Sequence, residues 1–480
     1  ESNAPGNIFW PDDKPTMMFQ IENTGDKPIQ ANGHVGVVPF ATEGIAGDIW
    51  KPRVVRLGDP IQQIAVKIDL PEKGSWQNLE IEPAIPQTKG GYALIVDLGD
   101  HGRKLLTTAV RTFAASPKRV RFPSQALDSM KPAVLQRMDI RAIRKGVGFV
   151  PPDAEHPHAR AKAARFEEEL KELHEHNVTV LAEVGAGPAD MPLGRARPHL
   201  DDRGFMLGGK MDYTWLPSED EQYRAFVKDL ASRYGWPKGP ITGFMLWNEP
   251  WEGRSISGWQ ADMPRYRTLY RIMAEAVNEA NREAGVQVLV GGCDSSTNTW
   301  DKLFPDGTDD FLPYLDFCSI HYQGLHSPAN YLYWRNRRHP NGRVRIFDTE
   351  SWVANTDDRY AGVVATNHAA GYDRAMGVFF GNITTQLSHG RTEHVNVRTA
   401  DGPERREKLL RAWPLAAAVG AVQHFIGDRP FKEVLFRPGL PWVYVFDGLD
   451  RNRGDGTVVV VGDIGSLFNH DIALYRTVRS

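Results

Sequence analysis

The pattern of apolar and polar positions divides the chain into three parts. The first stretch, roughly 115 residues, carries short alternating or apolar runs such as 16–21, 63–68 and 92–96, separated by Gly, Pro, Asn and Asp clusters. No helical period competes there, and the spacing is typical of a β-sandwich. Helical patterns then alternate with short apolar runs, which indicates parallel strands covered by helices. We therefore predict an N-terminal β-sandwich domain over residues 1–116 and an α/β domain over residues 117–427.

The α/β part contains seven recognisable strands. They are expected at 119–122, 140–143, 178–182, 241–247, 286–290, 317–321 and 344–349. Helices are expected at 134–138, 161–176, 219–234 and 265–284, and a last one over 404–426. Two segments compete for the eighth strand, one at 394–397 and one nearer Phe379. Eight such strand and helix units close into a (β/α)8 TIM barrel, which takes roughly 250 residues.

The pattern returns to β at the end of the chain. The runs 442–446 and 457–461 flank a turn-rich stretch and are expected to be two strands of a small sheet. We predict a C-terminal β element over residues 428–480, which is either incomplete or completed by strands of the N-terminal domain.

Composition narrows the classes of partner. The 480 residues are 41% hydrophobic and 24% charged, and no apolar run is long enough to cross a bilayer, so we expect no membrane insertion. The formal net charge of -3 argues against a chain-wide surface for nucleic acid or anionic lipid. A neutral or weakly charged partner fits better, and the oligomeric state stays open.

Two apolar runs, 243–250 and 345–352, each end in a polar tip that holds one glutamate. An apolar run fits a strand buried on both faces. The polar residues Asn248, Glu249 and Glu350 indicate that these strands end at a polar site. Catalytic residues of a parallel barrel lie at the carboxyl ends of its strands. Two glutamates that face each other are the usual equipment for breaking a glycosidic bond. Glu249 and Glu350 are therefore the candidate catalytic pair.

These tips also resemble a known family. Residues 247–250 read Trp-Asn-Glu-Pro and are similar to the fourth-strand signature of clan A glycoside hydrolases, while residues 348–352, Asp-Thr-Glu-Ser-Trp, are similar to the seventh-strand nucleophile motif. The resemblance implies a retaining β-glycoside hydrolase, with Glu249 as acid and base and Glu350 as nucleophile. It covers residues of about 117–427, and the accessory β modules suggest similarity to family 39 or family 5 enzymes, with the family itself left open. A transglycosylase and a catalytically silent carbohydrate-binding barrel are the alternatives.

The same resemblance implies several substrate-binding residues. Asn248 would hydrogen-bond the sugar 2-hydroxyl, and Arg144, at the end of the second strand, would favour the ionised nucleophile. The alternative for Arg144 is an ordinary exposed arginine. His321 and Tyr322 end the sixth strand, where relatives place a residue that contacts the nucleophile or the sugar. Successive strand residues face opposite ways, so which of the two points inward stays open.

Seven of the 13 tryptophans fall at or just beyond the expected strand ends. A flat indole stacks on the apolar face of a pyranose ring, so Trp251 and Trp352, which lie beside the glutamates, are expected to bind substrate. Arg195, Arg197 and Arg203 follow the third strand and would be the best-placed partners of an acidic or sulfated sugar, although a solvated loop is the simpler interpretation. We expect a neutral or mixed polysaccharide.

The remaining features carry less information. Cys293 and Cys318 each lie in an apolar run and are interpreted as small buried side chains, with a disulfide left open. His156 and His158 lack acidic or cysteine partners at ligand spacing, so no metal is expected, and no cofactor either. The chain opens at Glu1 without a leader, and export with removal of a signal peptide is expected for a polysaccharide enzyme.

Overall fold

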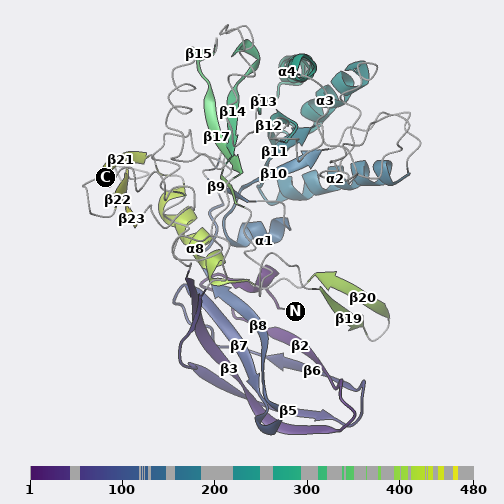
Figure 1. Ribbon diagram of the computed structural model, residues 1–480, viewed down its shortest axis with the longest axis vertical. Coiled ribbons are helices and arrows are strands. Elements are labelled where there is room, and N and C mark those ends of the chain that lie inside the picture. The colour runs from purple at the N-terminus through teal and green to yellow at the C-terminus, as the bar shows by residue number, and fades with distance from the viewer. Residues whose placement is uncertain are drawn as a thin grey trace, which may run out of the picture.

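The computed structural model describes residues 2–43, 54–117, 121, 123, 125–127, 131–147, 157–184, 220–248, 263–292, 312–321, 338–339, 342–350, 364, 377–379, 394–399, 402–408, 412–427, 429, 431–435, 442–447 and 458–462. A mostly antiparallel β region, a parallel α/β region and a small C-terminal sheet follow one another along the chain (Figure 1).

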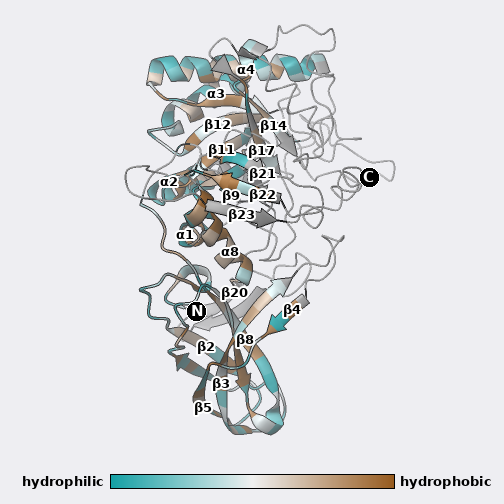
Figure 2. Cartoon of the chain, turned by 90° about the vertical axis from the view of Figure 1, so that its left-hand side faces the viewer, coloured by the Kyte–Doolittle hydropathy of each residue, from teal (hydrophilic) through white to brown (hydrophobic). Residues whose placement is uncertain are grey.

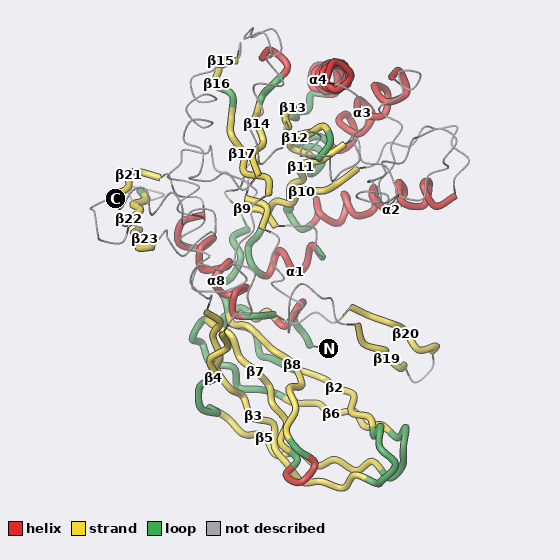
Figure 3. Tube along the Cα trace, viewed as in Figure 1, coloured by secondary structure: helices red, strands yellow, loops and turns green. Residues whose placement is uncertain are grey.

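The N-terminal region consists of strands and two short 3-10 turns, Pro5–Asn7 and Gly99–His101. The strands are β1 (Ile8–Phe9), β2 (Met17–Glu22), β3 (Ile29–Glu43), β4 (Val54–Leu57), β5 (Gln62–Leu70), β6 (Trp76–Ile81), β7 (Gly90–Asp97) and β8 (Arg103–Arg111). Six of them form one sheet in the order β1-β8-β7-β3-β4, with β5 also paired to β3, while β2 and β6 pair with each other (Figure 3). The prediction that this region is all-β is confirmed.

These two sheets share a hydrophobic core. Along β2 and β5, more buried side chains alternate with exposed ones, as half-buried strands require. Met17 of β2 and Leu79 of β6 belong to the same buried cluster as Val35 of β3 and Leu94 of β7. The small sheet therefore covers one face of the larger sheet.

Eight parallel strands form the second large sheet, in the order β17-β14-β13-β12-β11-β10-β9-β18. They are β9 (Gln125–Leu127), β10 (Ala142–Val147), β11 (Thr179–Val184), β12 (Ile241–Leu246), β13 (Leu289–Gly292), β14 (Phe317–His321), β17 (Arg345–Glu350) and β18 (Gly377–Phe379). The last strand, β18, pairs in parallel with the first, β9. It also lies in contact with β17, although no ladder joins their described residues. β18 therefore lies beside both β9 and β17.

Helices cover the outer face of this sheet. They are α1 (Pro132–Arg137), α2 (Pro157–Glu175), α3 (Asp220–Tyr234) and α4 (Met263–Ala284). Leu170 of α2, Tyr223 of α3 and Met273 of α4 pack in one buried cluster with Val180 of β11 and Phe244 of β12. Polar colour along much of α4 and apolar colour along β11 and β12 follow this division in Figure 2.

A second cluster fills the inner face of the parallel sheet. Ala142 of β10, Leu181 of β11, Met245 of β12 and Phe317 of β14 pack there together with Phe347 of β17. Gly291 makes room for this layer, because a Cβ at that position would lie 2.4 Å from ring atoms of Phe317. Side chains from neighbouring strands thus form one apolar layer on this face.

The first expected strand of the parallel sheet is wrong, and the structure decides between the two candidates for the eighth. The first strand is β9 and not 119–122, since Arg121 lies outside any strand and its Nη2 donates to the backbone carbonyl of Gln287 at 2.6 Å. For the eighth strand, the segment nearer Phe379 is right, because β18 pairs with β9. The competing segment lies in β19 (His394–Thr399), which is part of an antiparallel hairpin.

The helix expected over 404–426 is wrong in its first part. Gly402–Lys408 forms β20, which pairs antiparallel with β19. The charged run after Gly402 is paired residue by residue with β19, with Thr399 opposite Gly402 and Val397 opposite Arg405, so strand pairing decides its conformation. The helix α8 begins only at Pro414, spans Pro414–Val422 and continues as a π-helical turn over Gln423–Gly427.

The C-terminal β element contains three described strands. They are β21 (Phe431–Leu435), β22 (Trp442–Phe446) and β23 (Val458–Gly462), and neighbours pair antiparallel. Both expected strands are confirmed, and β21 is an addition. In the part of the chain that the structure describes, this sheet pairs with no N-terminal strand. Two short strands, β15 (Arg338–His339) and β16 (Gly342–Arg343), form a separate pair, and a 3-10 turn spans Leu312–Tyr314.

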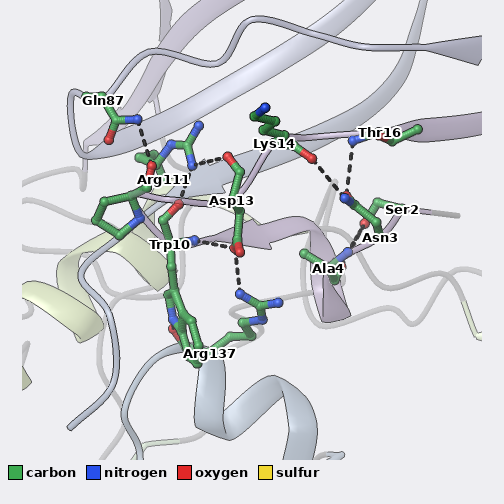
Figure 4. A network of polar contacts seen from close by, with 11 residues as sticks. Ser2, Asn3, Ala4, Trp10, Asp13, Lys14, Thr16, Gln87, Arg111 and Arg137 are labelled. Atoms are coloured by element: carbon green, nitrogen blue, oxygen red, sulfur yellow. Dashed lines mark hydrogen bonds and ion pairs between the residues drawn. The ribbon is translucent and has the colours of Figure 1, made fainter.

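A polar network joins the N-terminal region to α1 (Figure 4). The Asp13 carboxylate accepts hydrogen bonds from Arg137 Nη1 at 2.6 Å and from the Trp10 backbone N–H at 2.7 Å. The Trp10 indole Nε1 donates to the Arg137 carbonyl at 3.0 Å. Beside them, buried Arg111 donates to backbone carbonyls of Trp10, Asp13 and the 85–86 loop. The network fixes α1 against the start of the chain.

The segment that precedes α8 makes further contacts with the N-terminal region. The Ala412 backbone N–H donates to the Gly6 carbonyl at 3.1 Å. The rings of Trp413 and Phe40 meet edge to face at 5.5 Å. Ile8 of β1 belongs to the main buried cluster of the α/β region. The two regions are therefore joined by apolar packing as well as by polar contacts.

Candidate active site

Three polar side chains meet at the carboxyl ends of β10, β11 and β12, which are neighbours in the sheet (Figure 1). Arg144 Nη2 forms an ion pair with Glu183 Oε2 and donates a hydrogen bond to Asn248 Oδ1 at 2.5 Å. The side chains of Arg144 and Glu183 are both only 7% exposed. Arg144 is therefore a buried residue of this edge and not an ordinary surface arginine.

The strand period explains why these residues meet. Ala142 and Leu181 face the filled interior, and Arg144 and Glu183 each follow two positions later on the same strands, so they share the inner face. The interior is apolar at the level of Ala142 and Leu181 and becomes polar one layer nearer the carboxyl ends. That is where a parallel barrel exposes functional groups.

The chain takes a rare backbone conformation just before Asn248. Trp247 is fully buried and has φ of 59°, a left-handed value that is unusual for a bulky side chain. Its backbone N–H donates to the Val184 carbonyl at 2.8 Å, and the Tyr266 hydroxyl of α4 donates to the Leu246 carbonyl at 2.9 Å. The strand end is therefore held on both sides. Strained residues of this kind cluster at functional sites, and this one sets where Asn248 leaves the sheet.

On the other side of the site, β14 and β17 bring His321 and Glu350 into register. The register shifts just before this pair, so that Thr349 is an additional residue on β17. The buried hydroxyls of Thr349 and Ser319 hydrogen-bond to each other below the pair. Two of the predicted site residues therefore lie on neighbouring strands, at the same edge of the sheet as Asn248.

The charges at this edge are partly balanced by protein contacts. Arg144 and Glu183 form a buried pair whose net charge is zero, and burying an unpaired charge of either sign would be strongly unfavourable. Glu183 was missed by the sequence analysis. Its signal was a single carboxylate inside the otherwise apolar run 178–184.

Several predicted residues lie outside the described residues. These are Glu249, Trp251, Tyr322 and Trp352, together with Cys293 and the basic residues Arg195, Arg197 and Arg203. For His321 and Glu350 the backbone position is described. Cys318 is buried and carries a free thiol.

The described residues contain no group of three or more His, Cys, Asp or Glu side chains that could hold a metal ion. Nor does any helix in the described ranges have the length and apolar character needed to cross a membrane.

Comparison with known proteins gives a match in structure and none in sequence. No protein-family model matches the chain, and no curated protein matches it significantly. A family 39 glycoside hydrolase from the gut symbiont Bacteroides cellulosilyticus has a similar structure, with a TM-score of 0.52 and 13% identity, over 97% of this chain and 88% of that chain.

Two other solved structures give lower scores. A family 30 endoxylanase from Clostridium papyrosolvens has a TM-score of 0.43 at 14% identity, over 72% of this chain and 82% of its own. A family 39 β-xylosidase from Caulobacter crescentus has a TM-score of 0.41 at 16% identity, over 70% of this chain and 80% of its own. The similarity to the Bacteroides enzyme spans nearly the whole chain, so the resemblance to clan A glycoside hydrolases is confirmed at the level of the fold.

Proposed function

We propose that the protein is a retaining β-glycoside hydrolase in which Glu249 is the acid and base and Glu350 is the nucleophile. The observation that supports this most is the hydrogen bond from Arg144 to Asn248, on the same sheet edge as the register pair of His321 and Glu350. Glu249 directly follows Asn248 in the sequence. These observations support a site at the carboxyl ends of the strands, where barrel enzymes carry their catalytic groups.

The architecture that goes with this function is a closed (β/α)8 barrel over residues 117–427, with closure between β17 and β18. Residues 1–116 would form a β-sandwich domain, and residues 428–480 a C-terminal β element. The contact of β17 with β18 and the shared core of the N-terminal sheets support this division.

In the first step, a Glu350 carboxylate oxygen attacks the anomeric carbon while the bond from that carbon to the glycosidic oxygen breaks. Glu249 gives its proton to the departing oxygen, since an unprotonated sugar alkoxide is a poor leaving group. The product is a covalent glycosyl ester on Glu350, and the leaving sugar departs as an alcohol.

In the second step, Glu249, now a carboxylate, takes a proton from water as the water oxygen attacks the same carbon. The ester bond to Glu350 breaks, and both carboxyl groups return to their starting states. Asn248 would bind the sugar 2-hydroxyl, with His321 or Tyr322 beside the nucleophile. Trp251 and Trp352 would stack on sugar rings.

The test follows the anomeric configuration of the first product by proton NMR on an aryl β-glycoside. A panel of plant, algal and bacterial polysaccharides, scored by released reducing ends, identifies the glycosides to use. Early appearance of the β-anomer is expected, because two inversions restore the configuration. Early α-anomer would refute the mechanism, as would carboxyl groups of Glu249 and Glu350 far from the roughly 5 to 5.5 Å that retention requires.

The alternatives give other products. A transglycosylase would pass the sugar to an added acceptor in preference to water, and a silent binding barrel would retain affinity for the polymer without releasing reducing ends. Both glutamates are present in the sequence, and a pure binder would need neither.

We also propose that the protein acts outside the cytoplasm on a neutral or mixed polysaccharide, because a polymer cannot enter the cell intact. Immunodetection in the periplasm or medium of the producing cell tests the location. Detection only in the cytoplasm would refute it.

A further inference from the structure

Three described side chains, those of Arg144, Glu183 and Asn248, meet at the sheet edge. Of these three, Glu183 belongs to neither the sequence motifs nor the proposed chemistry. It comes from β11, between the strands that carry Arg144 and Asn248. Its carboxylate is buried at the polar edge of the sheet and forms an ion pair with the arginine. An acidic side chain buried at this level requires a compensating partner, and Arg144 is that partner.

The arrangement connects Glu183 to Asn248 through a single nitrogen. Arg144 Nη2 contacts the Glu183 carboxylate on one side and Asn248 Oδ1 on the other. A guanidinium is planar, so a carboxylate that fixes one N–H direction also fixes the other. Because the Asn248 oxygen accepts from Arg144, the amide end that can donate to a ligand is Nδ2.

We propose that Glu183 is a positioning residue of the active site, which orients the Asn248 amide through Arg144. The inference rests on the proposed function, in which Asn248 binds the substrate. Glu183 itself touches no reacting atom in this scheme. Its carboxylate keeps the guanidinium in the one orientation that turns the amide nitrogen toward the sugar, and it balances the arginine charge.

The variant Glu183→Gln keeps the size of the side chain and removes its charge. We expect kcat/KM on the best aryl glycoside to fall about 10-fold to 100-fold, the scale of a misplaced substrate-binding group. The stronger readout is a double-mutant cycle with Asn248→Ala. Once Asn248 is gone there is nothing left to orient, so Glu183→Gln should add at most about a threefold further loss. Losses that multiply in the double variant would overturn the proposal, as would a Glu183→Gln enzyme with wild-type kinetics.

A matched control exists just before β10, the strand that carries Arg144. Arg141 forms a two-pronged ion pair with Asp139, with N–O distances of 2.8 and 2.7 Å, and its side chain is buried like that of Arg144. Asp139→Asn removes a carboxylate from a buried arginine at the opposite end of β10, in a backbone conformation that Asn tolerates. It should lower stability and leave kcat/KM of the folded protein unchanged. Equal kinetic losses in both variants would mean a general structural effect and would overturn the proposal.

Crystal structures of the wild type and Glu183→Gln provide a readout that does not depend on turnover. We expect the Arg144 Nη2 to Asn248 Oδ1 contact of 2.5 Å to be lost in the variant. An unchanged contact would overturn the positioning role even in an active enzyme. If the contact is lost in Glu183→Gln but the wild-type protein cleaves no glycoside, the proposed function is refuted and the positioning role stands. If Glu183→Gln does not fold, Glu183→Asp keeps the charge, and the same cycle with Asn248→Ala decides.

Discussion

Two buried arginines, Arg111 and Arg144, bind different kinds of partner. Arg111 lies in the network between the N-terminal region and α1 (Figure 4), and every hydrogen bond described for its guanidinium goes to a backbone carbonyl. Arg144 lies at the carboxyl edge of the parallel sheet, and its described partners are the side chains of Glu183 and Asn248.

The two sets of partners give the two arginines different roles. Arg111 donates to the carbonyls of Trp10, Asp13, Ile85 and Pro86, which lie in loops and take part in no strand ladder, so it ties two loops together. Burial lowers the pKa of Arg111 from its ordinary value, and the nearby Asp13 and Tyr92 partly oppose that. Side chains, unlike backbone carbonyls, can rotate to meet a ligand. We therefore expect changes at the junction between the N-terminal region and α1 to affect stability. Changes at the carboxyl edge of the parallel sheet should affect activity.

The largest effect is expected at the sheet edge. Glu350→Ala should lower kcat by more than about 1000-fold on every glycoside, because no substrate can bypass the nucleophile. The unfolding midpoint should stay close to that of the wild type. Steady-state kinetics together with urea unfolding measure both.

The companion variant Glu249→Ala separates the roles of the two carboxyl groups. It should keep measurable activity on aryl glycosides, whose leaving groups need no proton. Added azide should rescue Glu350→Ala and give the inverted glycosyl azide. Equal loss for both variants on an activated substrate would contradict the assignment.

At the junction, Arg111→Met should lower the free energy of unfolding by about 3 kcal/mol, since four backbone carbonyls lose the hydrogen bonds that the guanidinium donates. The kcat/KM of the folded protein should not change. Arg103→Met on the same strand is the control, because Arg103 is 65% exposed and its ion pair with Asp97 is long, at 3.4 Å. A large loss of activity in folded Arg111→Met would remove the distinction between the two regions.

A smaller effect is expected from an ion pair on the outer surface. Hydrogen bonds from Arg233, and secondarily from Tyr234, lower the pKa of Glu167 to about 2, against the opposing effect of burial. A lowered folded pKa gives stability that is present above pH 4.5 and lost as the pH falls toward 2. Glu167→Gln should therefore flatten the fall in stability over that range. Because solvent screens the pair, the change should stay below about 1 kcal/mol.

Urea unfolding at several pH values between about 2 and 6 measures this effect. Glu175→Gln, an exposed position on the same helix, serves as the control. An identical pH dependence for Glu167→Gln and the wild type would contradict the assignment of the lowered pKa to this ion pair.

The smallest effect is expected in the basic loop. Replacing Arg195, Arg197 and Arg203 with Gln should change kcat/KM on the best polysaccharide by less than about twofold at any salt concentration, because a neutral polymer gains nothing from steering charges. A large loss that fades as salt rises would show that the substrate is acidic, and that charge at this edge extends beyond Arg144.

The sequence predicted most of the α/β framework because its signals are local. Apolar runs such as 317–321 coincide with a strand, here β14, and the amphipathic run 219–234 coincides with α3 to within one residue. The errors occurred where pairing over long distances decides. Gln125–Leu127 is too short to stand out, and it becomes a strand only because β10 and β18 lie on either side of it.

For the site, the motif residue Asn248 and the more weakly indicated Arg144 were found, and they do meet. Glu183 was not found, because a single acidic residue in a strand does not indicate a role until the neighbouring strand is known to place an arginine beside it. Pairwise electrostatics of this kind depends on register, and register is a property of the assembled sheet.

The hydrogen bond between Ala412 and Gly6 has a consequence for how the chain folds as it is synthesised. Residues near the start of the chain cannot complete their contacts until more than four hundred later residues have left the ribosome. Ile8 belongs to the same buried cluster as Leu415 of α8, so that cluster is also completed only when the chain is nearly finished. The antiparallel sheets and their contacts with α1 can therefore form early, whereas the contact of the first segment with residue 412 forms only when the chain is nearly complete. Pulse-labelled hydrogen exchange should find the amide of Ala412 among the last to become protected during refolding.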